Sequence, residues 1–228
     1  MMEKTQQQIL RHHGGDGDFA RQMITQSYER RHDVDFWAFW NQQLAEPIVR
    51  GDVLMDLGAG IGQFVNDLAL RYPENRVLGI EAAEYMLVAA LDLPKNAHLL
   101  RGDLLAPQDW GVNGQVAAVM ANMLLHELPQ PVCLIKAVYQ WLKPGGRWCI
   151  IDLVRQPLQS YLDHKFPANK LWQETMQNDE VATVFEHFLE HNRYHTEDLI
   201  YLLQSAGFVV LSQEPMGRMV RLVAEKPQ

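Results

Sequence analysis

One stretch, VLMDLGAGIGQF at residues 53–64, limits the fold more than any other part of the chain. Three apolar residues and Asp56 lead into Leu57, and then Gly58, Gly60 and Gly62 alternate with small or apolar residues. Glycine suits a turn in which the backbone takes left-handed dihedrals and passes close to a ligand. The stretch therefore predicts a strand, a glycine turn and a helix whose first N–H groups face a ligand.

The glycine spacing favours one kind of ligand over another. A dinucleotide-binding turn has the pattern G-x-G-x-x-G or G-x-G-x-x-A, whereas here the third glycine comes one position early and Gln63 occupies the last place. Asp56 stands two residues before Gly58. A carboxylate there suits a cationic group better than a pyrophosphate, because like charges repel.

The charge and the cysteines exclude several classes of protein. The net charge of −8 leaves no overall basic character for binding nucleic acid or an anionic membrane. Cys133 and Cys149, the only cysteines, suggest neither a disulfide framework nor a metal knuckle. The sequence has no signal-peptide pattern and no apolar run of about 18 residues. We expect one cytoplasmic domain over residues 1–228, without a membrane or nucleic-acid partner and with an open oligomeric state.

Hydrophobic patterns alternate between strand and helix over most of the chain. Helices are expected at residues 19–46, 62–71, 82–91 and 132–142, and strands at 53–56, 76–81, 97–100, 115–121 and 147–153. This rhythm predicts an α/β fold with a parallel sheet covered on both faces. We expect the aromatic cluster FWAFW at residues 36–40 to pack on the core rather than to roof a pocket.

Residues 154–195 depart from this alternation and predict a helical lid insertion. They are charged and rich in histidine and aromatic side chains, and their apolar positions suggest two or three helices. Thr196 is then expected to cap another helix, which ends at Gly207. Two closing strands follow within residues 208–225.

Polar residues follow successive strands in an ordered set. Glu81 ends the second strand, Asp103 follows the third, Asn122 and the segment HELP follow the fourth, and LKPGG precedes the fifth. Taken singly, Glu81 suits a helix cap and Asp103 a turn. Together with the glycine turn, they resemble the class I S-adenosylmethionine-dependent methyltransferases over residues 51–153, and residues 206–225 resemble the end of their sheet.

The resemblance implies a fold and a cofactor. It implies a Rossmann-like seven-stranded sheet in the order 3-2-1-4-5-7-6, with strand seven antiparallel and helices on both faces. It also implies S-adenosyl-L-methionine over the carboxyl ends of the strands, where α/β folds bind ligands, with S-adenosyl-L-homocysteine as the product.

The resemblance also assigns cofactor-binding residues. Asp56 and the turn Gly58, Gly60 and Gly62 would accommodate the methionine moiety, and Glu81 would hold the ribose. Asp103 and the Leu104 backbone would meet the adenine, and Asn122 would border the amino-acid end. Met86 would pack on the adenine or, equally, belong to the core.

Methyl transfer from a sulfonium is an in-line displacement, so most of the catalysis can come from alignment in a dry pocket. His126, after the fourth strand, is the first candidate for a base if the acceptor must lose a proton. Many relatives carry a histidine pair here, whereas this chain has Glu127 second. A histidine that only shapes the loop is the alternative. Tyr28 and Tyr194 are further catalytic candidates.

One pair of histidines in the predicted lid has the spacing of metal ligands on a helix. His187 and His191 are four residues apart, with Glu186 and Glu190 beside them, which permits a metal on a helix. Such a face is more often solvated. The aspartates of catechol-type methyltransferases are not evident, so we expect metal-independent transfer to a small-molecule acceptor. The alternatives are a tRNA or protein methyltransferase, or a non-catalytic S-adenosylmethionine-binding protein.

Overall fold

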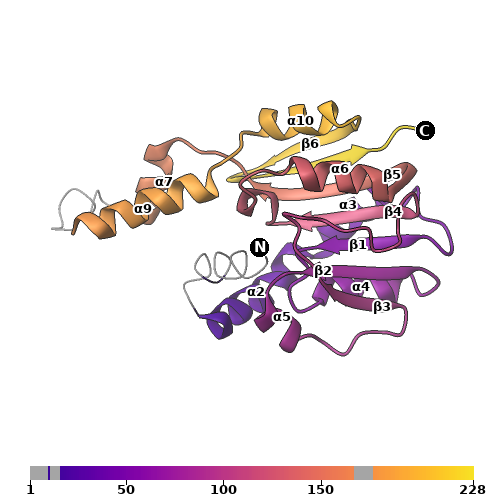
Figure 1. Ribbon diagram of the computed structural model, residues 1–228. Helices are drawn as coiled ribbons and strands as arrows, with labels where there is room; N and C mark the ends of the chain where they lie inside the picture. The colour runs from indigo at the N-terminus through magenta and orange to yellow at the C-terminus, as the bar shows by residue number, and fades with distance from the viewer. Residues whose placement is uncertain (1–9, 11–15, 167–176) are drawn as a thin grey trace.

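The computed structural model describes residues 10, 16–166 and 177–228, and its centre is a seven-stranded sheet (Figure 1). The strand order is β3-β2-β1-β4-β5-β7-β6, and β7 runs antiparallel to both of its neighbours. The predicted order and the antiparallel seventh strand are confirmed. The strands are β1 Val53–Leu57, β2 Arg76–Glu81, β3 Ala97–Arg101, β4 Val116–Asn122, β5 Leu142–Leu153, β6 Val209–Met216 and β7 Met219–Glu225.

Helices cover both faces because successive strand residues point in opposite directions. Met55 of β1 packs in the core beneath α6 (Val132–Trp141) and α10 (Thr196–Ser205). Its neighbour Leu54 packs in the core on the other face, beneath α3 (Val34–Gln43) and α4 (Gln63–Arg71). The two layers give the α/β architecture that the alternation predicted.

The aromatic cluster of α3 packs on the core, as expected. Phe36, Trp37 and Trp40 are buried, and the Trp37 ring stacks on Phe64 of α4 at 5.7 Å. The guanidinium of Arg71 lies 3.7 Å from the centre of the Trp37 ring, so the cluster also holds the end of α4.

Local chemistry moves several predicted boundaries. The N-terminal helical region is two helices, α2 (Gly17–Arg31) and α3, because the Asp33 carboxylate accepts the Phe36 N–H at 2.9 Å and starts a new helix. The helix after β2 is only α5, Glu84–Val88. The segment LKPGG at residues 142–146, expected to precede the fifth strand, lies within β5.

The predicted hydroxyl cap at Thr196 is wrong, because the N-cap of α10 is His195. Asp198, three residues into the turn, accepts the His195 N–H at 2.8 Å, and the His195 side chain accepts from the Asp198 amide. This reciprocal pair forms a capping box, in which an imidazole takes the place of the expected hydroxyl.

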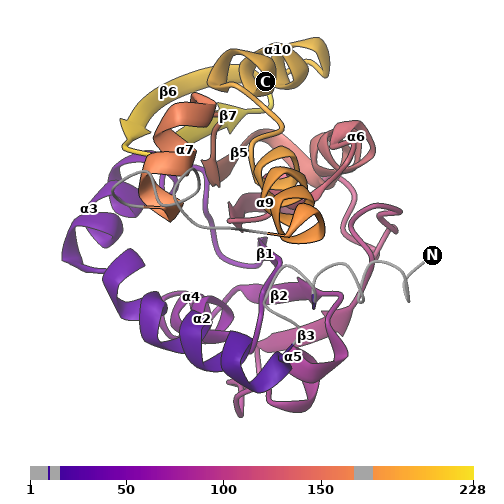
Figure 2. The same cartoon turned by 90° about the vertical axis from the view of Figure 1, so that its left-hand side faces the viewer.

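Helices from two distant parts of the chain lie beyond the carboxyl ends of the parallel strands. The insertion contributes α7 (Leu158–Lys165) and α9 (Asn178–His191), and residues 167–176 of the predicted lid lie outside the described part. Figure 2 shows α9 on one side of the end of β1 and α2 with α5 on the other. Helix α9 contacts the short helix η1 (Leu125–Glu127) after β4, and α2 contacts α5. None of the described helices combines the length and apolarity needed to cross a membrane.

Candidate active site

The glycine turn after β1 has the left-handed backbone that its sequence predicted. Gly58, Gly60 and Gly62 have φ angles of 77°, 55° and 88°. Side chains other than glycine rarely adopt this region, so each position favours glycine. The Gly58 amide donates to the Ile80 carbonyl at 2.9 Å, which holds the turn against β2, and Gly62 is the N-cap of α4.

A cavity of about 340 Å³ opens at this turn. Its volume is in the range of small-molecule sites. It lies at the carboxyl ends of β1, β2 and β4, between α2 on one side and η1 with the end of α9 on the other. Gly62 does not line it. The predicted cofactor residues that do are Asp56, Gly58, Gly60, Glu81, Met86, Asp103, Leu104 and Asn122.

Two buried acids give this cavity its charge. The Glu81 carboxylate accepts the Gly60 amide at 2.8 Å with one oxygen and the Ala83 amide at 2.7 Å with the other. Burial raises the pKa of Glu81, and these backbone N–H groups partly offset the rise. Burial, followed by the nearby Glu81 charge, raises the pKa of Asp56 to about 8. The pair therefore favours a ligand that brings positive charge or hydroxyl donors.

The remaining predicted cofactor residues surround the same space. Among the described residues, no partner is found for the buried Oδ1 atom of Asn122, which leaves an acceptor at the cavity. The Asp103 carboxylate accepts the Leu105 amide at 3.0 Å, so it shapes the turn after β3. Met86 both lines the cavity and packs with Ile61, so its two predicted roles are compatible.

His126 lines the cavity and is held by an acid from the next strand. Its Nδ1 atom lies 2.5 Å from an oxygen of Asp152, the buried acid near the end of β5. The amides of Leu124 and Leu125 donate to the same carboxylate. Burial alone would lower the pKa of His126, but the Asp152 and Glu127 carboxylates together outweigh it, and the pKa rises to about 10. With this proton in place, His126 donates hydrogen bonds.

The two predicted tyrosines occupy different positions. The Tyr28 hydroxyl, at the cavity, donates to Asp67 at 2.6 Å. Burial and the hydrogen bond to that carboxylate raise the pKa of Tyr28, so the phenol stays neutral. Tyr194 does not line the cavity, and its hydroxyl donates to the Leu128 carbonyl at 2.8 Å. Tyr28 and His126 are therefore the catalytic candidates that the cavity brings together.

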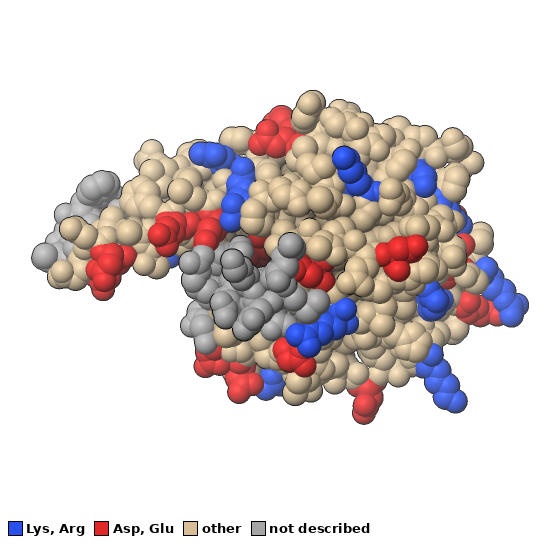
Figure 3. All heavy atoms as spheres, viewed as in Figure 1, with Lys and Arg blue, Asp and Glu red and all other residues tan. Residues whose placement is uncertain are grey.

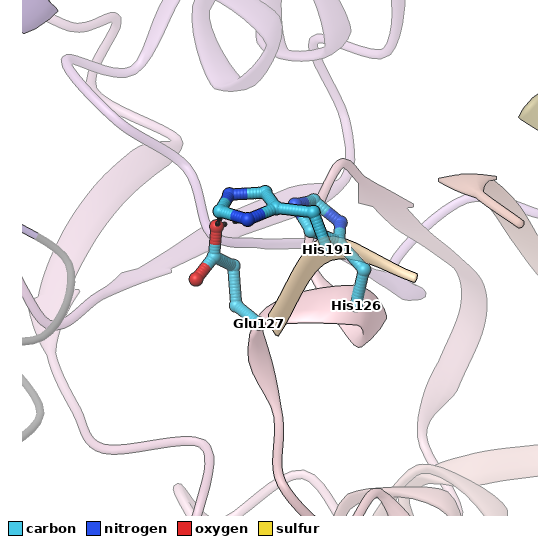
Figure 4. Close-up of side chains that lie close together, drawn as sticks. All are labelled: His126, Glu127 and His191. Carbon is cyan, nitrogen blue, oxygen red and sulfur yellow. Dashed lines mark ion pairs between the residues drawn. The ribbon is translucent and has the colours of Figure 1, made fainter. Parts of the chain in front are cut away.

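His187 and His191 form a stacked pair on α9, but the two rings meet different neighbours. His187 accepts or donates a hydrogen bond with the Tyr161 hydroxyl at 2.9 Å, and its ring stacks on His191 at 4.1 Å. His191, in contrast, reaches the cavity and lies beside His126 and Glu127 (Figure 4). The two rings therefore lie side by side on α9, as the spacing predicted, but only His191 lines the cavity.

Sequence reasoning missed two features of the site, one behind His126 and one on α2. Asp152 was visible only as an acid near the end of a strand, and its pairing with His126 depends on the parallel alignment of β4 and β5. Arg31, in the last turn of α2, lines the cavity together with His32. Burial, followed by the charge of Arg30, lowers the pKa of Arg31. No local signal could have shown which face of α2 meets the cavity.

The sheet order and the cavity at the carboxyl ends of the strands define a Rossmann-like architecture. Proteins of this broad α/β class bind cofactors at that edge of the sheet. A family model described as "Methyltransferase domain" matches residues 28–213, more than half of the chain. The chain therefore belongs to the class I S-adenosylmethionine-dependent methyltransferase family.

Individual relatives are more distant. Trans-aconitate 2-methyltransferase from Azoarcus sp. (strain BH72) is 27% identical over 129 residues, which cover 57% of this chain and 47% of that protein. The chain spans about half the length of the curated relatives it matches.

Solved structures share the fold at low identity. Phosphoethanolamine N-methyltransferase 2 from Haemonchus contortus, in complex with S-adenosyl-L-methionine, has a TM-score of 0.62 and 16% identity, covering 83% of this chain and 53% of that one. The cyclase SpnF has a TM-score of 0.58 and 18% identity, covering 81% and 78%. Because one of these neighbours is named a cyclase, the fold alone does not define the reaction.

Proposed function

We propose that this protein transfers the methyl group of S-adenosyl-L-methionine to a small anionic acceptor, within one methyltransferase domain over residues 1–228. In this proposal, residues 19–46 supply the covering helices and residues 154–195 the lid. The observation that carries the proposal is the cavity itself. It joins the glycine turn, two buried acids and an acceptor atom of Asn122 to Arg31 of α2 and His126 of η1.

The cavity residues fit the cofactor on physical grounds. The buried Asn122 Oδ1 atom gains from a ligand that donates a hydrogen bond, because a buried acceptor left without one costs about 1–3 kcal/mol. The Glu81 carboxylate accepts the amides of Gly60 and Ala83 and also meets the Ala82 amide, and its four lone pairs still leave a position for a ribose hydroxyl. Asp56 favours a cationic ligand such as the amino-acid end of the cofactor.

A carboxylate is the acceptor class that Arg31, on the α2 side of the cavity, favours. Arg31 lines it as a half-buried cation, and its guanidinium donates to the Ser27 hydroxyl. Burial and the neighbouring positive charge of Arg30 both disfavour the Arg31 cation, and a bound anion would stabilise it. The curated relatives are named trans-aconitate methyltransferases, which is consistent with an organic acid.

A carboxylate acceptor needs no general base, which agrees with a protonated His126 and a neutral Tyr28. A carboxylate oxygen would attack the methyl carbon while the carbon–sulfur bond breaks. The bonding electrons return to sulfur, and the sulfonium becomes a neutral thioether. The contribution of the protein is to align the two reactants and exclude water.

Charge supports a small acceptor over nucleic acid. Figure 3 shows basic and acidic side chains interspersed on the face in view, rather than gathered into a basic patch. The net charge of −8 points the same way. The unpaired cysteines, Cys133 and Cys149, favour the cytoplasm as the compartment, because thiols persist under reducing conditions.

The test is to incubate the purified protein with S-adenosyl-L-methionine and a panel of mono-, di- and tricarboxylates, phenols and amines. Mass spectrometry then detects S-adenosyl-L-homocysteine and the methylated acceptor. We expect turnover of a carboxylate, and Arg31→Met should raise its KM while the cofactor Kd stays unchanged. Cofactor binding without turnover of any acceptor would instead favour the non-catalytic alternative.

A further inference from the structure

Three side chains that can ligate a metal meet beside the cavity. His126 and Glu127 come from η1, and His191 ends α9 (Figure 4). One candidate ligand atom from each residue lies within 4.8 Å of the other two. The Nε2 atoms of His126 and His191 lie 3.2 and 3.5 Å from the same Glu127 oxygen. Two ligand atoms of a tetrahedral zinc ion are about 3.4 Å apart, so both of these Nε2–oxygen distances match the spacing of a zinc site.

The other nitrogen of each ring is also arranged as in metal sites. The Nδ1 atom of His126 contacts the Asp152 carboxylate at 2.5 Å, and the Nδ1 atom of His191 contacts the His187 carbonyl at 3.1 Å. Metal-binding histidines usually donate this second N–H to a carboxylate or a backbone carbonyl, which fixes the ring and directs Nε2 at the ion. Here both Nε2 atoms are directed toward Glu127.

The charge of the cluster suits a divalent cation. Asp152 is fully buried and Glu127 is 19% exposed, so two carboxylates lie in a largely dry environment. A divalent ion brings two positive charges, which match the two carboxylates. Imidazole and carboxylate together are ligands that Zn²⁺ and similar transition-metal ions accept.

We propose that His126, Glu127 and His191 bind one divalent transition-metal ion such as Zn²⁺. The ion connects α9 to η1, two elements far apart in the sequence, and it would replace the expectation of metal-independent transfer.

The three protein ligands leave coordination positions for another group. Because all three residues line the cavity, these positions face the space where the acceptor would bind. An acceptor carboxylate oxygen is the group that fits this position. That role rests on the proposed function, whereas metal binding itself does not.

The test is calorimetric titration of the chelator-treated full-length protein with Zn²⁺, without S-adenosylmethionine, together with elemental analysis after buffer exchange. We expect one ion per chain. His191→Ala and Glu127→Gln should each weaken binding by about 100-fold or more, because even outer partners of metal ligands contribute about 10- to 100-fold. His164→Ala, which removes an exposed histidine of α7, should bind as the wild type does.

Two results would overturn the site: a wild-type protein that retains no zinc, or a folded His191→Ala protein that binds zinc as tightly as the wild type. A Cys133→Ser version of each protein controls for binding by the exposed thiol. Titration of the same samples with S-adenosyl-L-homocysteine tests the proposed function separately, because the proposed cofactor residues do not include Glu127 or His191.

Discussion

Asp56 links cofactor binding to pH. In the free protein the pKa of Asp56 is about 8. Ionising its carboxyl group at pH 7, one unit below this pKa, therefore costs about 1.4 kcal/mol. A cationic cofactor favours the carboxylate, and binding must therefore release the Asp56 proton below pH 8. If only the ionised form binds tightly, this carboxylate weakens the observed affinity about tenfold at pH 7 and about a hundredfold at pH 6, relative to pH 9.

The assay is calorimetric titration of the wild type and Asp56→Asn with S-adenosyl-L-methionine between pH 6 and 9. Changes in the ionisation of the cofactor affect both proteins equally, so the ratio of their Kd values isolates Asp56. The wild-type advantage should grow with pH and level off above 8. The exposed Asp92→Asn serves as the matched control and should follow the wild type. A ratio that stays constant from pH 6 to 9 would refute the reasoning.

The same pKa shift makes a prediction for stability without ligand. A carboxyl group whose pKa is raised by folding stabilises the folded state at low pH, and this contribution is lost as the pH rises through the folded pKa. Between about pH 4 and 8, the free energy of unfolding of the wild type should therefore fall relative to that of Asp56→Asn. Urea unfolding at both ends of this range measures the difference.

Three further substitutions test the packing and the cavity. Gly79→Ala would place a Cβ atom 2.5 Å from Leu99, and this overpacking should destabilise the protein by about 1–3 kcal/mol in urea unfolding; an unchanged midpoint would contradict the geometry. Glu81→Gln leaves one acceptor oxygen for two backbone amides and the ribose, so S-adenosyl-L-homocysteine should raise the melting temperature less than in the wild type. Tyr28→Phe removes the hydrogen bond to Asp67 and should cost about 1.5–3 kcal/mol of stability, while kcat falls less than about tenfold, because a neutral phenol is not the base. A thousandfold loss of kcat would reverse that assignment.

The parts of the fold that depend on local patterns were predictable. The strand from Arg76 to Glu81 was placed correctly because a proline-containing turn precedes an apolar run. The left-handed dihedrals of the glycine turn were predictable from its three glycines. The break between α2 and α3 was missed because the capping effect of Asp33 competes with a helical pattern on both sides.

Features that depend on contacts between distant parts of the chain could not be predicted from the sequence. The pairing of His126 with Asp152 depends on how two parallel strands align, and no spacing along the chain reveals that alignment. The approach of His191 to Glu127 depends on the path of α9 across the end of the sheet. Helical periodicity placed His191 beside His187 correctly, but it did not show which ring meets the cavity.

Calorimetric titration of the wild-type protein with S-adenosyl-L-homocysteine tests the central claim most directly, because it needs no knowledge of the acceptor. The account predicts one binding site per chain and a matching rise in melting temperature, since a ligand that binds only the folded state stabilises it. A protein that is folded by circular dichroism but shows neither heat of binding nor a shift in melting temperature would contradict the account.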